Sequence, residues 1–147
     1  AVARGVGEKL DFVDQLRRYH IVLCDPGIPA STIEVYKNID LRLTFAGKDN
    51  IRTGLNMPIR GQEFDAAGCL CNDLEESAYR LYPGIMKVKK EMISVLNKPV
   101  FMTGSGSSLF ALYSESKTAE AAFEKLSAVW SGTDRAVFLS SFLQAKN

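Results

Sequence analysis

The stretch from Val100 to Glu115, VFMTGSGSSLFALYSE, constrains the fold of this chain more than any other. Two apolar runs, at 100–102 and 109–113, enclose six residues that are all Gly, Ser or Thr. This pattern predicts a strand, a glycine-rich loop and a second strand. Because glycine has no Cβ and tolerates positive φ, the loop can turn sharply and let another group approach its backbone closely.

Two interpretations of this loop are open. The backbone N–H groups around Gly104 and Gly106 can turn inward and form a concave anion site. Hydroxyl donors that carry no charge would be added by Ser105, Ser107 and Ser108. The alternative is a hairpin turn that only reverses two core strands. No Lys follows the last glycine, as a Walker A loop requires, and the third glycine of GxGxxG is missing, so the loop indicates phosphate contact without identifying a reaction.

Composition and charge exclude several classes of partner. The 147 residues are enough to bury a sizeable core, and with no linker or repeat we predict a single domain over residues 1–147. Eighteen basic and seventeen acidic side chains give a net charge of +1, which offers no electrostatic footprint for nucleic acid. No apolar stretch approaches the roughly 20 residues that span a bilayer. We therefore expect neither a nucleic acid nor a membrane partner, and the sequence does not predict the oligomeric state.

The cysteines and the one histidine predict no metal site. Cys24, Cys69 and Cys71 are too few and too oddly spaced for a disulfide framework or a zinc site. Reduced thiols in a cytosol-like compartment are the simplest interpretation. We expect His20 to be packed or solvated rather than a catalytic base. The chain begins at Ala1 without an initiator Met, which fits a piece of a longer protein.

The first half of the chain predicts a strand and a short helix. Residues 1–10 look like the end of a strand that enters a turn, and residues 19–24, YHIVLC, form a β-prone run that a Pro-Gly pair stops. Ser31 can cap a helix that runs to about residue 39, with Glu34 three residues further on. Residues 41–70 are the least regular segment, in which we expect only short helical turns.

The longest helical pattern begins at Asn72. Its apolar residues recur at steps of three and four and place one stripe along more than five turns: Leu74, Ala78, Leu81, Ile85, Val88, Met92 and Val95. Asn72 is a good cap, and Glu75 at the third helical position can reach back to it. Pro83 lies inside the pattern, so we expect a kink or a break there.

The last third of the chain completes an α+β pattern. Residues 116–129 predict a helix and residues 135–143 a final strand. From Tyr19 the order is then strand, helix, helix, strand, strand, helix, strand. This order resembles a ferredoxin-like α+β domain, an antiparallel sheet with helices packed on one face.

The residue patterns that carry catalysis are missing. No HExxH, GxSxG or Cys/His constellation appears, and the carboxylates lie mainly on predicted helix faces as solvated charge. An enzyme that consumes ATP needs Mg²⁺ ligands and a nucleotide cradle, and the sequence shows neither. The chain thus has the features of half an active site, and we expect no catalytic residue in it.

Four segments resemble a known family of kinases. TGSGSSLFA at 103–111 closely matches the third signature motif of the GHMP small-molecule kinases, a glycine-rich loop of their C-terminal domain. ARGVGE at 3–8, PGIPASTIEVYKNIDL at 26–41 and NDLEESAYRLYP at 72–83 look like corresponding segments of the 4-diphosphocytidyl-2-C-methyl-D-erythritol kinases in that superfamily. The segments occur in the right order, and only residues 42–70 lack a clear counterpart.

The resemblance implies an enzyme of non-mevalonate isoprenoid synthesis. Such an enzyme phosphorylates the 2-hydroxyl of the methylerythritol moiety with ATP and Mg²⁺, in a cleft between two domains. The family's ATP-binding motif, catalytic Asp and neighbouring Lys lie in the N-terminal domain, and no such segment is present here. The chain would then be the C-terminal, substrate-side domain of a kinase, with its own N-terminal domain as partner. We expect it to be inactive alone, to bind neither ATP nor Mg²⁺ tightly, and to reside in the cytoplasm or, in a plant or alga, in the plastid stroma.

The resemblance assigns site residues in two places. Gly104 to Ser108 match the family loop that lines the phosphate-transfer cleft and shapes the site of the substrate and nucleotide phosphates. Tyr36 falls where the family places an aromatic ring against the cytosine of the substrate, and a flat ring is suited to stacking on a base. Thr32 is a second candidate, for a polar contact near the same pocket. The structural alternative for Tyr36 is an amphipathic helix residue that packs on the sheet, and Ile33 stands where some relatives carry proline.

Two other functions stay open. The chain could belong to another GHMP kinase that acts on a different alcohol, such as homoserine or mevalonate, although the segment around Tyr36 argues against both. It could also be a non-catalytic ligand-binding or regulatory module, as free-standing ferredoxin-like domains often are. The missing catalytic groups would then be real absences.

Overall fold

The computed structural model describes residues 2–4, 9–11, 17–39 and 65–142. The chain divides into two compact units, Ala1–Arg17 with Gly47–Leu70, and Arg18–Ala46 with Cys71–Asn147. The single domain over 1–147 stays a prediction. Most of the irregular segment expected at 41–70 lies outside the described residues.

The described residues of the smaller unit form a two-stranded antiparallel sheet and one short helix. Strand β1 (Val2–Arg4) pairs with β2 (Lys9–Asp11), which fits the strand expected at the start of the chain, whereas the turn expected there lies outside the described residues. The 3₁₀ helix η1 (Ala66–Cys69) begins after Asp65, whose carboxylate accepts the N–H of Ala67 at 2.9 Å. This cap satisfies one of the free donors at the start of the helix.

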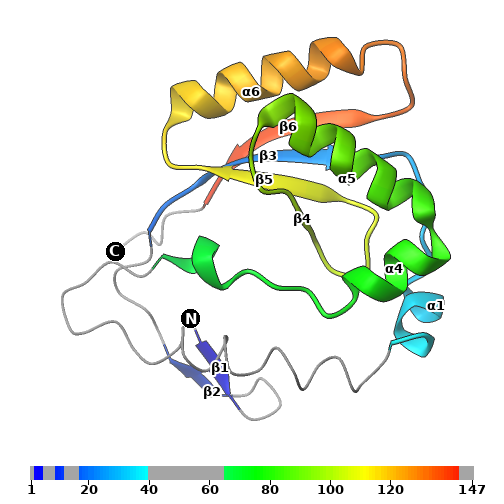
Figure 1. Cartoon of the computed structure of the whole chain (residues 1–147). Helices are drawn as coiled ribbons and strands as arrows, with labels where there is room; N and C mark the ends of the chain where they lie inside the picture. Colours follow the sequence, from blue (N-terminus) through cyan, green and yellow to red (C-terminus); the bar gives the residue numbers. More distant parts are fainter. Residues whose placement is uncertain (1, 5–8, 12–16, 40–64, 143–147) are drawn as a thin grey trace. The chain divides into compact units, whose positions relative to one another are not determined.

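The larger unit is built on a four-stranded antiparallel sheet (Figure 1). Its strands, in the order β4-β5-β3-β6, are β4 (Phe101–Met102), β5 (Leu109–Tyr113), β3 (His20–Asp25) and β6 (Ala136–Ser141). The first predicted strand, β3, lies in the middle of the sheet and pairs with both β5 and β6. All four strands expected from the sequence in this part of the chain are confirmed.

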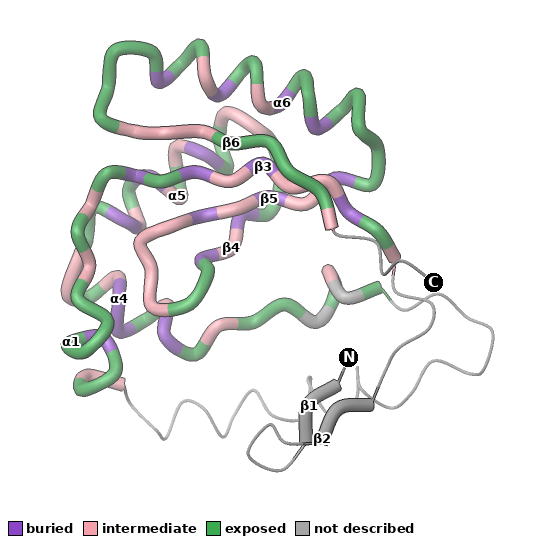
Figure 2. Tube along the Cα trace, turned by 180° about the vertical axis from the view of Figure 1, so that it is seen from behind, coloured by how far each residue is buried: buried purple, intermediate pink, exposed green. Residues whose placement is uncertain are grey.

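Alternation along the two inner strands decides which face of the sheet is the core. Val22 and Cys24 of β3 are fully buried, whereas Ile21 and Leu23 are only half-buried. In β5 the buried positions are Leu109, Ala111 and Tyr113. Because side chains alternate between the faces of a strand, these residues all point to one side of the sheet. The same alternation is visible as purple and pink segments in Figure 2.

Four helices among the described residues complete the larger unit. They are α1 (Thr32–Lys37), α4 (Glu75–Leu81), α5 (Pro83–Leu96) and α6 (Ser116–Val129). Helix α6 packs on β3, β5 and β6, α5 packs on α6, α4 on α5, and α1 on α4. Figures 1 and 2 show α5 and α6 on the same side of the sheet. The predicted fold, a ferredoxin-like α+β domain with helices on one face, is confirmed. None of the helices described in this chain is long and apolar enough to cross a membrane.

The break expected at Pro83 separates α4 from α5. Helix α4 ends at Leu81, Tyr82 leaves the helical region with φ −129° and ψ 74°, and Pro83 opens α5. Proline is favoured at this first position because its missing N–H would have no intrahelical partner there. The long apolar stripe therefore continues over two helices, which are separated by one non-helical residue, Tyr82.

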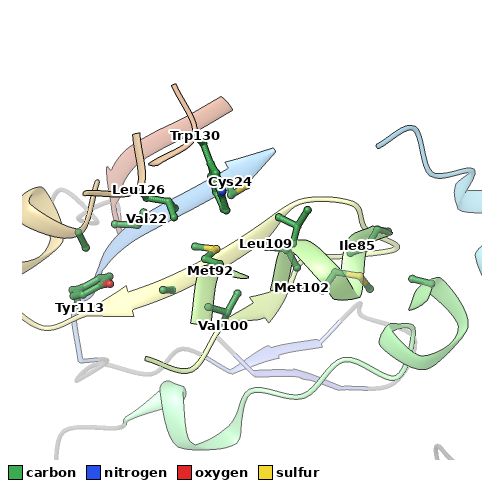
Figure 3. Packing of buried hydrophobic residues seen from close by; sticks show 14 of the residues in the cluster. Val22, Cys24, Ile85, Met92, Val100, Met102, Leu109, Tyr113, Leu126 and Trp130 are labelled. Carbon is green, nitrogen blue, oxygen red and sulfur yellow. The ribbon is translucent and has the colours of Figure 1, made fainter. Parts of the chain in front are cut away.

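The hydrophobic core lies between the sheet and the helices (Figure 3). Helix α5 contributes Ile85, Val88 and Met92, which are at most 3% exposed, and α6 contributes Leu126. Burial of such side chains stabilises a fold by about 1.5–3 kcal/mol each. The stripe of apolar residues found in the sequence is thus the stripe that faces the core, and it fixes the first turn of α4 beside the end of β4.

Candidate phosphate and substrate site

The glycine-rich loop joins β4 to β5 as a tight hairpin. The N–H of Thr103 donates to the carbonyl of Ser108 at 3.0 Å, and the N–H of Gly106 donates to the carbonyl of Thr103 at 3.1 Å. Gly104 has φ +56° and Gly106 has φ +88°, so two of the six residues adopt a backbone conformation that favours glycine. The structure confirms the hairpin turn, and it also leaves the loop free to bind an anion.

Four amide groups of the loop backbone are unused donors. The N–H groups of Gly104, Ser105, Ser107 and Ser108 donate to no acceptor in the part of the chain that the structure describes. All four residues are half-buried or exposed, so a ligand can reach them. Where such backbone donors converge, they form anion-binding concavities. Since the loop carries no charged side chain, it would bind phosphate oxygens through N–H and O–H groups alone.

Gly106 is also required by the packing beneath the loop. A Cβ built on it would lie 3.0 Å from the Sδ of Met102 and 3.4 Å from the Cδ1 of Ile85. Both neighbours belong to the buried core, and Figure 3 shows them at the same end of the cluster. At Gly104, in contrast, nothing lies within 4 Å of the position that a Cβ would take. The loop therefore rests directly on the core at Gly106 and is open at Gly104.

Asn72 connects this loop to the first turn of α4. Its Nδ2 donates to the carbonyl of Met102 at 2.9 Å and to that of Gly104 at 2.8 Å. Its Oδ1 accepts the N–H of Leu74 at 3.1 Å, in the turn before α4. Because the N-cap of α4 is Leu74 and no side chain caps the helix, the capping role expected for Asn72 is wrong, and its side chain joins this turn to the loop.

Glu75 does not form the capping box that the sequence predicted. Its Oε1 accepts a hydrogen bond from the N–H of Met102 at 2.9 Å, and its Oε2 accepts one from the Nζ of Lys89 at 2.8 Å. The backbone of β4 competes successfully for this carboxylate because β4 ends next to the helix. Tyr79, one turn further along α4, is affected in turn: burial, and secondarily the charge of Glu75, raise the pKa of its hydroxyl, which stays protonated at neutral pH.

Helix α1 carries the two candidate substrate-binding residues to the loop. The hydroxyls of Thr32 and Ser105 are 2.9 Å apart and share a hydrogen bond. Tyr36 lies four residues after Thr32 and so on the same face of the helix, one turn away. Its side chain is 57% exposed, whereas Val35 supplies the buried contact of α1. The alternative in which Tyr36 packs on the sheet is therefore wrong, and its ring is available to a ligand.

Three hydrogen bonds hold α1 in place on α4 and on the residue that follows it. The hydroxyl of Ser77 donates to the carbonyl of Val35 at 2.8 Å, and Arg80 donates to the carbonyl of Asn38 at 2.6 Å. At the other end, the N–H of Ser31 donates to the hydroxyl of Tyr82 at 3.0 Å. The carbonyls of Val35 and Asn38, which come before and after Tyr36 in the sequence, are thus bonded to side chains of α4.

The sequence reasoning missed these anchors. The partners in each bond are 42 or 51 residues apart, so no local pattern pairs them. One signal was present: Ser77 is 3% exposed and lies on the apolar face of α4, next to Ala78. A buried hydroxyl in such a place is expected to have a hydrogen-bond partner.

The described residues contain no cluster of His, Cys, Asp and Glu side chains that could hold a metal ion. His20 is half-buried at the start of β3, in the strand rather than in the loop. The donors at the site, from 103–108 and Thr32, are neutral amides and hydroxyls, which suit phosphate oxygens rather than a cation. The described residues of this site therefore offer hydrogen-bond donors to phosphate oxygens and offer no cluster of carboxylate ligands to Mg²⁺.

Comparison with known proteins places the chain in a family. The family model "GHMP kinases C terminal" matches residues 59–132, about half of the chain. A 4-diphosphocytidyl-2-C-methyl-D-erythritol kinase of Syntrophotalea carbinolica is 38% identical over 127 residues, which cover 86% of this chain and 43% of that protein. A kinase of the same name from Alkaliphilus metalliredigens is 32% identical over 133 residues, or 90% of this chain and 45% of that protein.

Solved structures agree with this result. The crystal structure of a 4-(cytidine 5'-diphospho)-2C-methyl-D-erythritol kinase matches 93% of this chain and 48% of its own chain, with a TM-score of 0.60 and 29% identity. The homoserine kinase of Cytophaga hutchinsonii, with a TM-score of 0.57, 15% identity and coverage of 84% of this chain and 41% of its own, shares the fold. The chain spans less than half the length of these relatives. With its glycine-rich loop inside the matched region, this chain belongs to the GHMP kinases, in the family of their C-terminal domains.

Proposed function

We propose that this chain is the C-terminal, substrate-side domain of an ATP-dependent kinase that phosphorylates the 2-hydroxyl of 4-diphosphocytidyl-2-C-methyl-D-erythritol, in non-mevalonate isoprenoid synthesis. The names of its relatives support this acceptor, and their greater length supports an N-terminal domain as its partner. We further propose a cytoplasmic location, or the plastid stroma in a plant or alga.

One hydrogen bond carries the proposal, because it joins the glycine-rich loop to helix α1. The loop of residues 104–108 has free N–H groups suited to phosphate, and Thr32 joins it to the helix that bears Tyr36. A nucleoside diphosphate has two parts that suit these elements: a flat base for the aromatic ring and two phosphates for the loop. In this proposal the ring of Tyr36 stacks on the cytosine, and the loop binds phosphate oxygens. Stacking of a base on an aromatic side chain contributes about 1–3 kcal/mol.

The loop would contribute to phosphoryl transfer by positioning and by electrostatic stabilisation. Catalysis of this reaction depends on holding the acceptor and donor in line and on stabilising charge on the transferred group. Fixed N–H dipoles at Ser105 and its neighbours can do both without reorganising. ATP supplies the phosphoryl group, and we assign its Mg²⁺ no ligand among the described residues. The base and the Mg²⁺ ligands belong, in this proposal, to the N-terminal domain.

The proposal is tested by exchanging Tyr36 in the full-length protein, meaning this chain together with the N-terminal domain that we propose. ADP release is measured with ATP, Mg²⁺ and either cytidine diphosphate methylerythritol or homoserine as acceptor. We expect activity with the cytidine substrate only. Tyr36→Ala should raise the KM for that substrate by about 5- to 100-fold, the equivalent of one lost stacking contact.

Ile33→Ala is the matched control, because Ile33 lies on the same helix and is 66% exposed. It should leave the KM for the cytidine substrate unchanged. Equal effects of the two substitutions would show that Tyr36 has no special contact with the base. Activity with homoserine in place of the cytidine substrate would overturn the proposed acceptor.

A further inference from the structure

We propose that Asn72 is a positioning residue that sets the direction of the Ser105 N–H in the phosphate-binding loop, with Glu75 as its support. Neither residue touches a substrate in this scheme; both act through the loop. The inference rests on the proposed function in one respect, that the loop binds phosphate, and its geometry stands on the described contacts.

The first step is the geometry of one peptide group. The carbonyl of Gly104 accepts a hydrogen bond from the Nδ2 of Asn72 at 2.8 Å. In a trans peptide, the carbonyl of one residue and the N–H of the next point in opposite directions. When Asn72 draws the Gly104 carbonyl toward α4, the N–H of Ser105 must therefore point away from α4. This N–H is one of the four in the loop that have no acceptor in the described part of the chain.

The second step is that the base of the loop is held at the same place. The Nδ2 of Asn72 also donates to the carbonyl of Met102 at 2.9 Å, and the carboxylate of Glu75 accepts a hydrogen bond from the N–H of Met102 at 2.9 Å. Both polar groups of the Met102 backbone are thus bonded to Glu75 of α4 and to Asn72 in the turn before it. Met102 itself is 2% exposed, so water cannot replace these partners easily.

The third step is that the support is itself fixed. Glu75 is bonded to Lys89 at 2.8 Å, and their side chains are 23% and 17% exposed. Lys89 belongs to α5, which is anchored in the core through Val88 and Met92. The position of the loop is therefore fixed by hydrogen bonds to packed helices and not by the hairpin alone. Such support from packed elements holds the groups of a binding site within a fraction of an ångström.

The test uses the full-length protein labelled with ¹⁵N-glycine and follows kinetics and amide resonances together. Asn72→Ala removes both donors, and Asn72→Asp removes them while keeping an oxygen for the Leu74 N–H. We expect each variant to lower kcat about 10- to 100-fold, as a misplaced reacting group does. The KM for the cytidine substrate should rise less than in Tyr36→Ala, because the base contact on α1 is kept and only the contact of the loop with phosphate is weakened.

The resonances separate positioning from general loss of structure. Gly104 and Gly106 flank Ser105, and their amide signals should move in both Asn72 variants, while that of Gly132, in the turn after α6, should not. Glu75→Gln should move the same two signals, whereas Glu76→Gln, an exposed carboxylate one residue further on, should move neither and leave kcat unchanged.

The outcomes decide the proposal in each case. Loss of kcat with unmoved signals of Gly104 and Gly106, unchanged kcat, or loss of the fold in both Asn72 variants would overturn the positioning role. If the wild-type protein releases no ADP with the cytidine substrate, the proposed function fails, but the glycine signals still show whether Asn72 holds the loop.

Discussion

Replacing Gly106 by alanine should destabilise the fold through two separable effects. The first is backbone strain, because φ is +88° and L-residues in left-handed conformations cost about 1–2 kcal/mol. The second is overpacking, because the new Cβ would lie 3.0 Å from the Sδ of Met102 and 3.4 Å from the Cδ1 of Ile85. Overpacking of a core typically costs about 1–3 kcal/mol. Together they predict a loss of about 3 kcal/mol in the free energy of unfolding, within the ranges of both effects.

Two other glycines supply the control for strain alone. Gly104 has φ +56° and Gly132 has φ +78°, and neither has an atom within 4 Å of the place where a Cβ would be. Their replacement by alanine should therefore cost only the backbone term, about 1–2 kcal/mol. The excess loss at Gly106 measures the contact with the core.

The measurement is urea unfolding followed by the fluorescence of Trp130, the one tryptophan of the sequence, which is 5% exposed. A change in the midpoint at constant m-value reports stability directly. Equal losses in Gly104→Ala and Gly106→Ala, or a Gly106 variant as stable as the wild type, would refute the reasoning that the loop rests on the core.

Further predictions concern the core and its polar contacts. Burial raises the pKa of the Cys24 thiol from its ordinary value of 9.0 to about 12, so alkylation of Cys24 at pH 8, followed by mass spectrometry, should be at least about 100-fold slower in the folded protein than in urea. Because the folded state keeps this proton up to about pH 12 and the unfolded chain loses it near pH 9, the stability should fall as the pH rises between these values; an unchanged urea midpoint there would contradict the shift. Ser77→Ala removes the hydroxyl that donates to the buried Val35 carbonyl, which keeps the N–H of Asn38 at 3.3 Å, and should cost about 0.5–1.5 kcal/mol in urea unfolding; an unchanged midpoint would contradict this role of Ser77. Arg135→Met removes the ion pair with Glu91 and the cation that lies 4.8 Å from the centre of the Trp130 ring. It should lower the free energy of unfolding by about 1 kcal/mol, and high salt should reduce this difference because it screens the ion pair.

The elements of the fold could be predicted because their signals are local. The 116–129 helix, the break at Pro83 and the strands on either side of the glycine-rich loop follow from apolar periodicity and from proline and glycine chemistry. Their packing on one face follows from the single apolar stripe of each helix. Segregated strands and helices then leave few arrangements for a chain of this length.

The hydrogen-bond network of the site could not be predicted because its hydrogen bonds join residues that are far apart in the sequence. Asn72 could be placed just before the helix from its neighbours, but its contact with the loop depends on carbonyls that lie 30 and 32 residues further on. Glu75 fits the pattern of a capping box, yet the end of β4 supplies a donor that sequence cannot place. Tyr36 fits an amphipathic helix equally well, and only its exposure shows that the ring does not enter the core.

The central claim is that this chain supplies one side of a kinase cleft and not the whole of it. The most direct measurement is ADP release with ATP, Mg²⁺ and cytidine diphosphate methylerythritol, made on the full-length protein and on residues 1–147 alone. We predict turnover by the full-length protein and none above background by the chain alone, because this chain spans less than half the length of the kinases that it matches. Turnover by residues 1–147 at the full-length rate, or none by the full-length protein, would contradict the account.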